Sequence, residues 1–120
     1  MEDVLANLDE ETQKQIQELQ IFEHNFQQLL MQKQAFSGEL NEINMSLDEL
    51  EKSEGEVFKI VGGIIIKSTK EKLKEDLNHK KELIGLRLKS IDKQEKEISK
   101  RAEELREEIM KKISANENKK

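Results

Sequence analysis

The stretch GGIIIKST, at residues 62–69, has the residue types of a phosphate-binding loop: two glycines, a lysine and two hydroxyl side chains. In such a loop the glycine backbone cradles the phosphates, the lysine reaches the outer phosphates and the hydroxyl binds Mg²⁺. The loop requires a glycine directly before the lysine, and Ile66 stands there instead. The spacing therefore argues against nucleotide binding, and we expect no cofactor.

The other residues that could do chemistry do not converge on a site. His24 and His79 fall on outward positions of different predicted helices, so we expect them to be solvated rather than to bind a metal. The chain has no cysteine, which excludes disulfides, thiolate catalysis and a cysteine zinc site. Its many carboxylates belong to a charged surface, whereas catalytic carboxylates need burial that shifts their pKa. We expect neither an enzyme nor a metal site.

The composition is that of a long-helix protein. Of the 120 residues, 39% are charged, 34% are hydrophobic and none is proline, as is typical of coiled coils. The net charge of -5 and the lack of Trp and Tyr argue against nucleic-acid binding, which needs basic patches and stacking aromatics. The acidic start MEDVLANLDEE is unlike a signal peptide, and the apolar runs are too short to span a membrane. We expect a cytoplasmic protein with no membrane or nucleic-acid partner.

A heptad repeat runs through the first half of the chain. Positions spaced alternately by three and four residues are apolar at eleven of fourteen places. These positions are Leu5, Leu8, Thr12, Gln15, Leu19, Phe22, Phe26, Leu29, Lys33, Phe36, Leu40, Ile43, Leu47 and Leu50. A 3.5-residue repeat that keeps one register for so long predicts a coiled-coil seam rather than an ordinary amphipathic helix.

A second, weaker seam occupies the second half. It is apolar at eight of ten positions, which are Leu77, Lys81, Ile84, Leu88, Ile91, Glu95, Ile98, Ala102, Leu105 and Ile109. Each helix would span roughly 40–50 residues, on the order of 60–75 Å, which is too long for a compact bundle of this mass. We therefore expect the two helices to fold back as an antiparallel pair, with partner residue numbers that sum to about 125.

Between the two seams lies VFKIVGGIIIKST, residues 57–69. Two runs of β-forming residues flank Gly62 and Gly63, and a glycine pair suits a two-residue turn that requires positive φ. This turn predicts a β-hairpin in which Val61 pairs with Ile64 and the register continues to Phe58 opposite Lys67.

The ends of the elements follow from local signals. Gly55 is a suitable stop for the first helix, and Ser68 or Thr69 is a suitable start for the second. We expect one domain over residues 1–120. Its parts are a helix at 1–52, a hairpin element at 53–69, a helix at 70–115 and a frayed tail at 116–120.

Both faces of the predicted hairpin are mainly apolar. A two-stranded hairpin is marginal in water, its edges carry unpaired backbone groups, and a sheet with one wet face normally alternates apolar and polar residues. The hairpin is therefore predicted to assemble with other chains into an intersubunit β-barrel. The assembly residues are Phe58, Ile60, Val61, Gly62, Gly63, Ile64, Ile65 and Ile66. The alternative is that the hairpin folds onto its own helices, which offer little core.

Three segments carry a resemblance to a known family. They are LLMQKQAFSGELNEINMSLDELE, VFKIVGGIIIKSTKEKLKEDL and DKQEKEISKRAEELREEI. The chain resembles a β-class prefoldin subunit, which has two long helices and a single hairpin, whereas α-class subunits carry two hairpins. Phe58 stands where the family usually has Tyr. The resemblance implies a hexamer of two α and four β subunits that join their hairpins into barrels.

The resemblance also implies a function. Prefoldin is an ATP-independent chaperone that holds non-native polypeptide at the distal ends of its helix pairs and passes it to a group II chaperonin. The expected register places Leu5 and Leu8 opposite the polar NENKK tail, so these two and Val4 lack apolar partners, and Met110 and Ile113 lie close by. Exposed apolar groups often mark an interaction site. The expected client contacts are Val4, Leu5, Leu8, Ile109, Met110 and Ile113. The alternative function is a coiled-coil scaffold or filament subunit that binds no client. The need for an α partner stays open.

Overall fold

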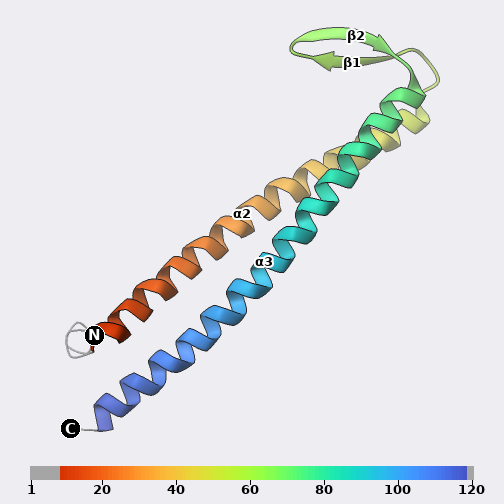
Figure 1. Cartoon of the computed structure of the whole chain (residues 1–120). Coiled ribbons are helices and arrows are strands. Elements are labelled where there is room, and N and C mark those ends of the chain that lie inside the picture. The colour runs from red at the N-terminus through yellow and green to blue at the C-terminus, as the bar shows by residue number, and fades with distance from the viewer. Residues whose placement is uncertain (1–8, 119–120) are drawn as a thin grey trace. The chain divides into compact units, whose positions relative to one another are not determined.

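The computed structural model describes residues 9–118, in which two long helices flank a two-stranded antiparallel sheet in the sequence (Figure 1). The elements are α2 (Glu10–Lys52), β1 (Val57–Val61), β2 (Ile64–Ser68) and α3 (Lys70–Asn118). The predicted mainly α fold, with one hairpin between two antiparallel helices, is confirmed.

The chain divides into two units, each built from parts of both helices. The terminal unit combines Met1–Met31 with Ile91–Lys120, and the central unit is Gln32–Ser90, which includes the hairpin.

Local capping explains where each helix begins. The Thr12 backbone N–H donates to the Asp9 carboxylate at 2.8 Å, so Asp9 caps α2, which begins at Glu10. Hydrogen bonds with Thr12 lower the pKa of Asp9. The helix was expected from residue 1, and residues 1–8 lie outside the described part of the chain. The Thr69 hydroxyl accepts from the Lys72 N–H at 3.1 Å, so α3 begins at Lys70 as predicted.

The far end of α3 differs from the expectation. The helix continues to Asn118, past the predicted end at residue 115. The polar composition of residues 116–118 predicts a frayed tail, yet Asn and Glu impose no break, since only Gly and Pro strongly oppose a helix.

The seam of the terminal unit is the predicted one. The side chains that it buries are Thr12, Leu29, Ile91, Ala102, Leu105 and Ile109. Polar contacts across the pair join Gln15 to Glu108 at 3.0 Å and Glu23 to Arg106 at 3.1 Å. These pairs match the register in which partner numbers sum to about 125, as expected for an antiparallel helix pair.

The seam of the central unit keeps the same register. Ile43, Leu50 and Ile84 are buried. The Arg87 guanidinium lies 5.5 Å from the centre of the Phe36 ring, close enough for a cation–π contact between the helices. Lys81, which interrupts the predicted seam, is exposed, so the helix pair tolerates this charge by leaving it in water.

The hairpin has the predicted turn and register. Gly62 and Gly63 have φ of 56° and 82°, the left-handed values that a type I′ turn requires of both central residues. Val61 pairs with Ile64, Ile60 with Ile65, and Phe58 with Lys67.

Two isoleucine truncations test the seam. Ile91 is 4% exposed and Ile21 is 58% exposed, both in the terminal unit. We expect Ile91→Ala to lower the free energy of unfolding by about 2–4 kcal/mol, because it leaves a cavity between the helices. Ile21→Ala should change it by less than about 0.5 kcal/mol. Urea unfolding followed by circular dichroism measures both, and equal losses would contradict the assigned seam.

Candidate functional site

The β-hairpin carries the largest group of exposed aliphatic side chains that the structure describes. Six of its apolar residues are between 47% and 74% exposed: Phe58, Ile60, Val61, Ile64, Ile65 and Ile66. Because side chains alternate along a strand, these six occupy both faces of the sheet. The hairpin therefore does not bury its apolar faces on its own helices, and the alternative of a folded-down hairpin does not hold.

A cleft of about 620 Å³ lies beside the hairpin within the central unit. Strand β1 lines one side, and the C-terminal end of α2 and the first turns of α3 line the other. The Lys59 ammonium crosses to α3 and lies 3.6 Å from the Asp76 carboxylate. Both side chains are partly exposed, so the pair orients the hairpin more than it stabilises it.

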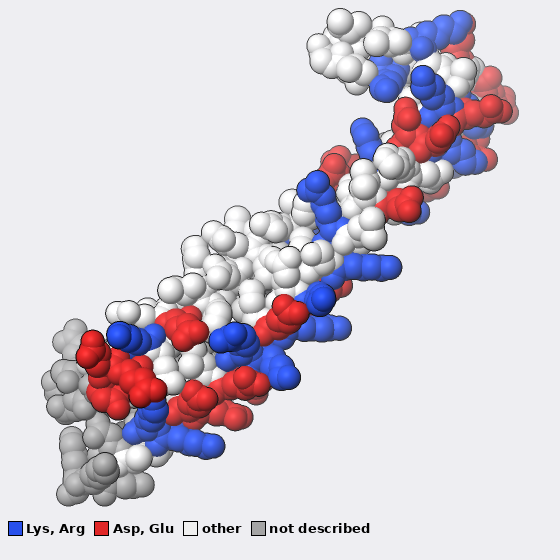
Figure 2. Space-filling model, viewed as in Figure 1, with Lys and Arg blue, Asp and Glu red and all other residues white. Residues whose placement is uncertain are grey.

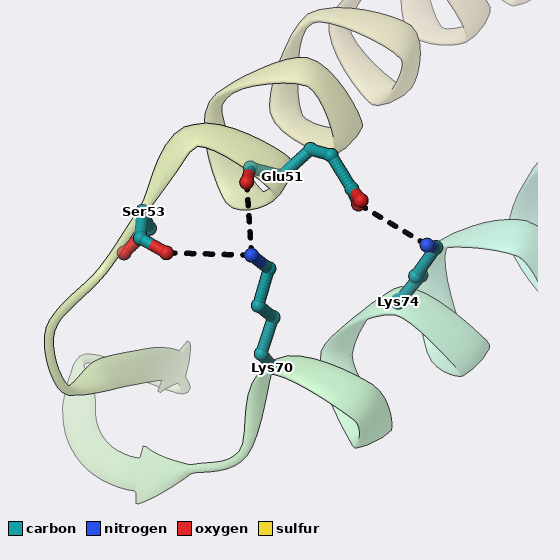
Figure 3. A network of polar contacts seen from close by, with 4 residues as sticks. All are labelled: Glu51, Ser53, Lys70 and Lys74. Carbon is teal, nitrogen blue, oxygen red and sulfur yellow. Dashed lines mark hydrogen bonds and ion pairs between the residues drawn. The ribbon is translucent and has the colours of Figure 1, made fainter.

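The root of the hairpin is held by a lysine of α3 (Figure 3). The Lys70 ammonium donates to the backbone carbonyl oxygens of Glu51 at 2.8 Å and Ser53 at 3.3 Å. The Lys74 ammonium lies 3.1 Å from the Glu51 carboxylate. The last carbonyls of a helix lack intrahelical partners and carry partial negative charge, so a cation at this end is favourable.

This junction replaces the expected glycine stop. Gly55 does not have a positive φ, so it does not form the left-handed cap that ends many helices. The helix ends before Ser53 as predicted, but Lys70 supplies the donors from across the chain reversal. One signal was available in the sequence: a lysine in the first turn of a helix opposes the helix dipole, so it needs another reason to be there.

The ion pair at the junction shifts the pKa of one carboxylic acid, Glu51. The hydrogen bond from Lys74, with the charges of Lys74 and Lys70, lowers the pKa of Glu51. The folded junction therefore favours the carboxylate form, and this contribution is lost as the pH falls through the lowered value.

The expected client contacts fall into three groups. Val4, Leu5 and Leu8 lie outside the described residues. Met110 is 62% exposed and Ile113 is half-buried. Ile109 is only 6% exposed, because it is a seam residue that faces α2. Ile109 therefore supports the helix pair, and the neighbouring Met110 is the side chain that reaches the surface.

The remaining candidate residues do not form a site. His24 and His79 are exposed, as expected. Among residues 9–118, no group of three or more His, Cys, Asp or Glu side chains is placed to hold a metal ion. In the same part of the chain, no helix is long and apolar enough to cross a membrane.

The fold and the site together define a class. The antiparallel helix pair with an uncovered apolar hairpin belongs to the class of mainly helical proteins whose exposed strands are a candidate surface for contact with other chains.

Comparisons with known proteins give the family. The model of the family described as prefoldin subunit matches residues 3–116. The prefoldin subunit beta of Pyrococcus furiosus is 32% identical over 107 residues, which are 88% of this chain and 92% of the relative. That of Saccharolobus islandicus is 35% identical over 106 residues, 87% of this chain and 84% of the relative.

A solved structure agrees. The crystal structure of the prefoldin beta subunit from Thermococcus strain KS-1 superposes with a TM-score of 0.82 at 32% identity, covering 88% of this chain and 94% of that chain. The chain therefore belongs to the prefoldin family, in the group of β subunits. It is a non-enzymatic chaperone subunit, and it assembles with other prefoldin subunits.

Substitution of the junction lysine tests its role. Lys70→Met keeps the aliphatic stem but removes both hydrogen bonds to the end of α2. We expect a loss of about 1–2 kcal/mol in the free energy of unfolding, because bonds from a charged donor and the dipole interaction both disappear. The exposed neighbour Lys72 is the control, and Lys72→Met should cost less than about 0.5 kcal/mol. Equal losses in the two variants would contradict a capping role for Lys70.

Proposed function

We propose that this chain is a subunit of an ATP-independent holdase, in which the hairpin builds the oligomer and the terminal unit captures non-native polypeptide. The holdase prevents aggregation in the cytoplasm and passes its clients to a group II chaperonin. Its partners are prefoldin α subunits and further β subunits, with two α and four β chains in the complex.

The exposure of both hairpin faces is the observation that carries the proposal. Burial of one large apolar side chain contributes about 1.5–3 kcal/mol, and six such side chains of the hairpin remain in contact with solvent in the single chain. The free edges of β1 and β2 also carry unpaired backbone groups, which favour pairing with strands of other chains. Closure of such strands into a barrel buries one face and removes the edges.

The terminal unit suits client capture because it exposes an adaptable side chain in the part of α3 that contacts the first turns of α2. Met110 has an unbranched thioether that packs against surfaces of many shapes. We propose Met110 and Ile113 as client contacts, together with Val4, Leu5 and Leu8. Ile109 acts by holding α3 against α2, which keeps Met110 on the outer surface.

A charge placed in the hairpin tests the assembly. In Ile60→Asp and Ile65→Asp, a carboxylate replaces one of two paired residues on the same face. We expect each variant to lose the oligomer and to keep its helical content, because a charge cannot be buried unpaired in a barrel. Analytical ultracentrifugation and circular dichroism measure the two properties. Leu83→Asp is the control: Leu83 is an exposed residue of α3 in the same unit, and its variant should assemble normally. Full assembly of the Ile60 and Ile65 variants would refute the barrel.

A pair of methionine variants tests client capture. Met110 and Met45 are 62% and 60% exposed, but only Met110 is in the terminal unit. We expect Met110→Glu to weaken protection of a denatured client about fivefold, equivalent to about 1 kcal/mol, and Met45→Glu to leave it unchanged. Light scattering of guanidinium-denatured citrate synthase, diluted into the assembled protein without ATP, gives the measurement.

The same assay separates a chaperone from a scaffold. A scaffold subunit would assemble through its hairpin and give no protection in any variant. Protection that requires ATP would contradict the holdase mechanism, and equal effects of the two methionine variants would contradict capture near Met110.

A further inference from the structure

Over two heptads, residues 20–31, the outward face of α2 in the terminal unit carries no charge. In these two heptads, the six positions opposite the seam hold exposed residues: Gln20, Ile21, His24, Gln27, Gln28 and Met31. We call this surface the amide face of α2. Met31 is 69% exposed and Ile21 is 58% exposed, so two apolar side chains stand among the amides.

The equivalent face of α3 in the same unit has the opposite character. Over two heptads, its six outward residues are Lys96, Glu97, Lys100, Glu103, Glu104 and Glu107, and every one of them is exposed and charged. Figure 2 shows the contrast, with Lys, Arg, Asp and Glu gathered over α3 and an uncharged surface over the middle of α2, past the charged side chains at its start. A solvent-facing helix surface is normally polar and charged. Folding does not require the amide face, since α2 already buries its seam on the other side.

The chemistry of the amide face suits a surface that is covered part of the time. Burial of an unpaired charge is expensive, whereas a glutamine amide that finds a hydrogen-bond partner is buried at little cost. Each glutamine both donates and accepts, so it pairs with a peptide group in either orientation. The Gln28 amide and the His24 ring share a hydrogen bond of 3.2 Å, so these two side chains are already held together.

We infer that the amide face of α2 binds an uncharged, extended segment of a non-native polypeptide. An extended segment exposes the unpaired N–H and C=O groups that glutamine side chains complement, and its apolar side chains can rest on Ile21 and Met31. Charge also selects this occupant, because a charged partner finds no counter-charge on the amide face. The inference rests on the proposed function, since it adds a second contact surface for the same clients.

Two double variants with the same change in charge test the inference. Ile21→Glu with Met31→Glu places two carboxylates on the amide face, and Lys93→Gln with Lys100→Gln removes two ammonium groups from the exposed face of α3. Each pair lowers the net charge by two, so a general charge effect would appear in both. We expect the first variant to need about tenfold more assembled protein for half-protection of denatured citrate synthase, and the second to act as the unchanged chain does.

Photo-crosslinking supplies a positive readout. The photoreactive residue benzoylphenylalanine, placed at Gln27, should crosslink to the denatured client, whereas at Lys100 it should not. Protection that is unchanged in the Ile21/Met31 variant, with no crosslink at Gln27, overturns the inference. So does a lower oligomer mass of that variant, because the face would then be a contact between subunits. These outcomes leave the proposed function standing if Met110→Glu still weakens protection. If the unaltered protein gives no protection, the proposed function fails and the inference falls with it.

Discussion

A two-stranded hairpin with two apolar faces cannot cover itself, and the rest of the structure follows from this constraint. The helix pair has to hold the hairpin in a defined place without burying it. Polar contacts do this, because they orient a segment and leave its apolar surface free. Lys70 binds the backbone oxygens at the end of α2, and Lys59 reaches Asp76 from β1. The hairpin is thereby attached at its root, and its apolar faces stay uncovered.

Much of this arrangement was predictable because two signals in the sequence determine it, a heptad repeat and a glycine pair. The 3.5-residue repeat identified the seam, and residues such as Ile43, Ile84 and Ile91 are buried as that repeat required. The glycine pair then determines the register of the hairpin and of the helix pair. With Gly62 and Gly63 as the turn, only one set of cross-strand partners is possible, and the reversal also decides which residues of the two helices meet.

The contacts that were not predictable depend on proximity in space rather than on periodicity. The repeat placed Ile109 on the seam and Met110 outside it, so it did not support Ile109 as a client contact. Nor could it show that Lys70 binds a carbonyl oxygen at the end of α2, or that Gly55 does not form a left-handed cap there. A lysine that caps a helix from another element leaves only an indirect trace, namely its unfavourable place in the first turn of its own helix.

The two uncovered surfaces of the chain differ in a way that matches their proposed roles. The aliphatic hairpin gains a large free energy when it is covered, which suits a permanent contact between subunits. The amide face of α2 exchanges hydrogen bonds with water for hydrogen bonds with a peptide, and the net gain of each exchange is small. The proposed holdase uses no ATP, so its client has to dissociate from it without an energy source before a chaperonin can take the client over. Weak, uncharged contacts spread along a helix permit this release, whereas a second surface as apolar as the hairpin would retain the client.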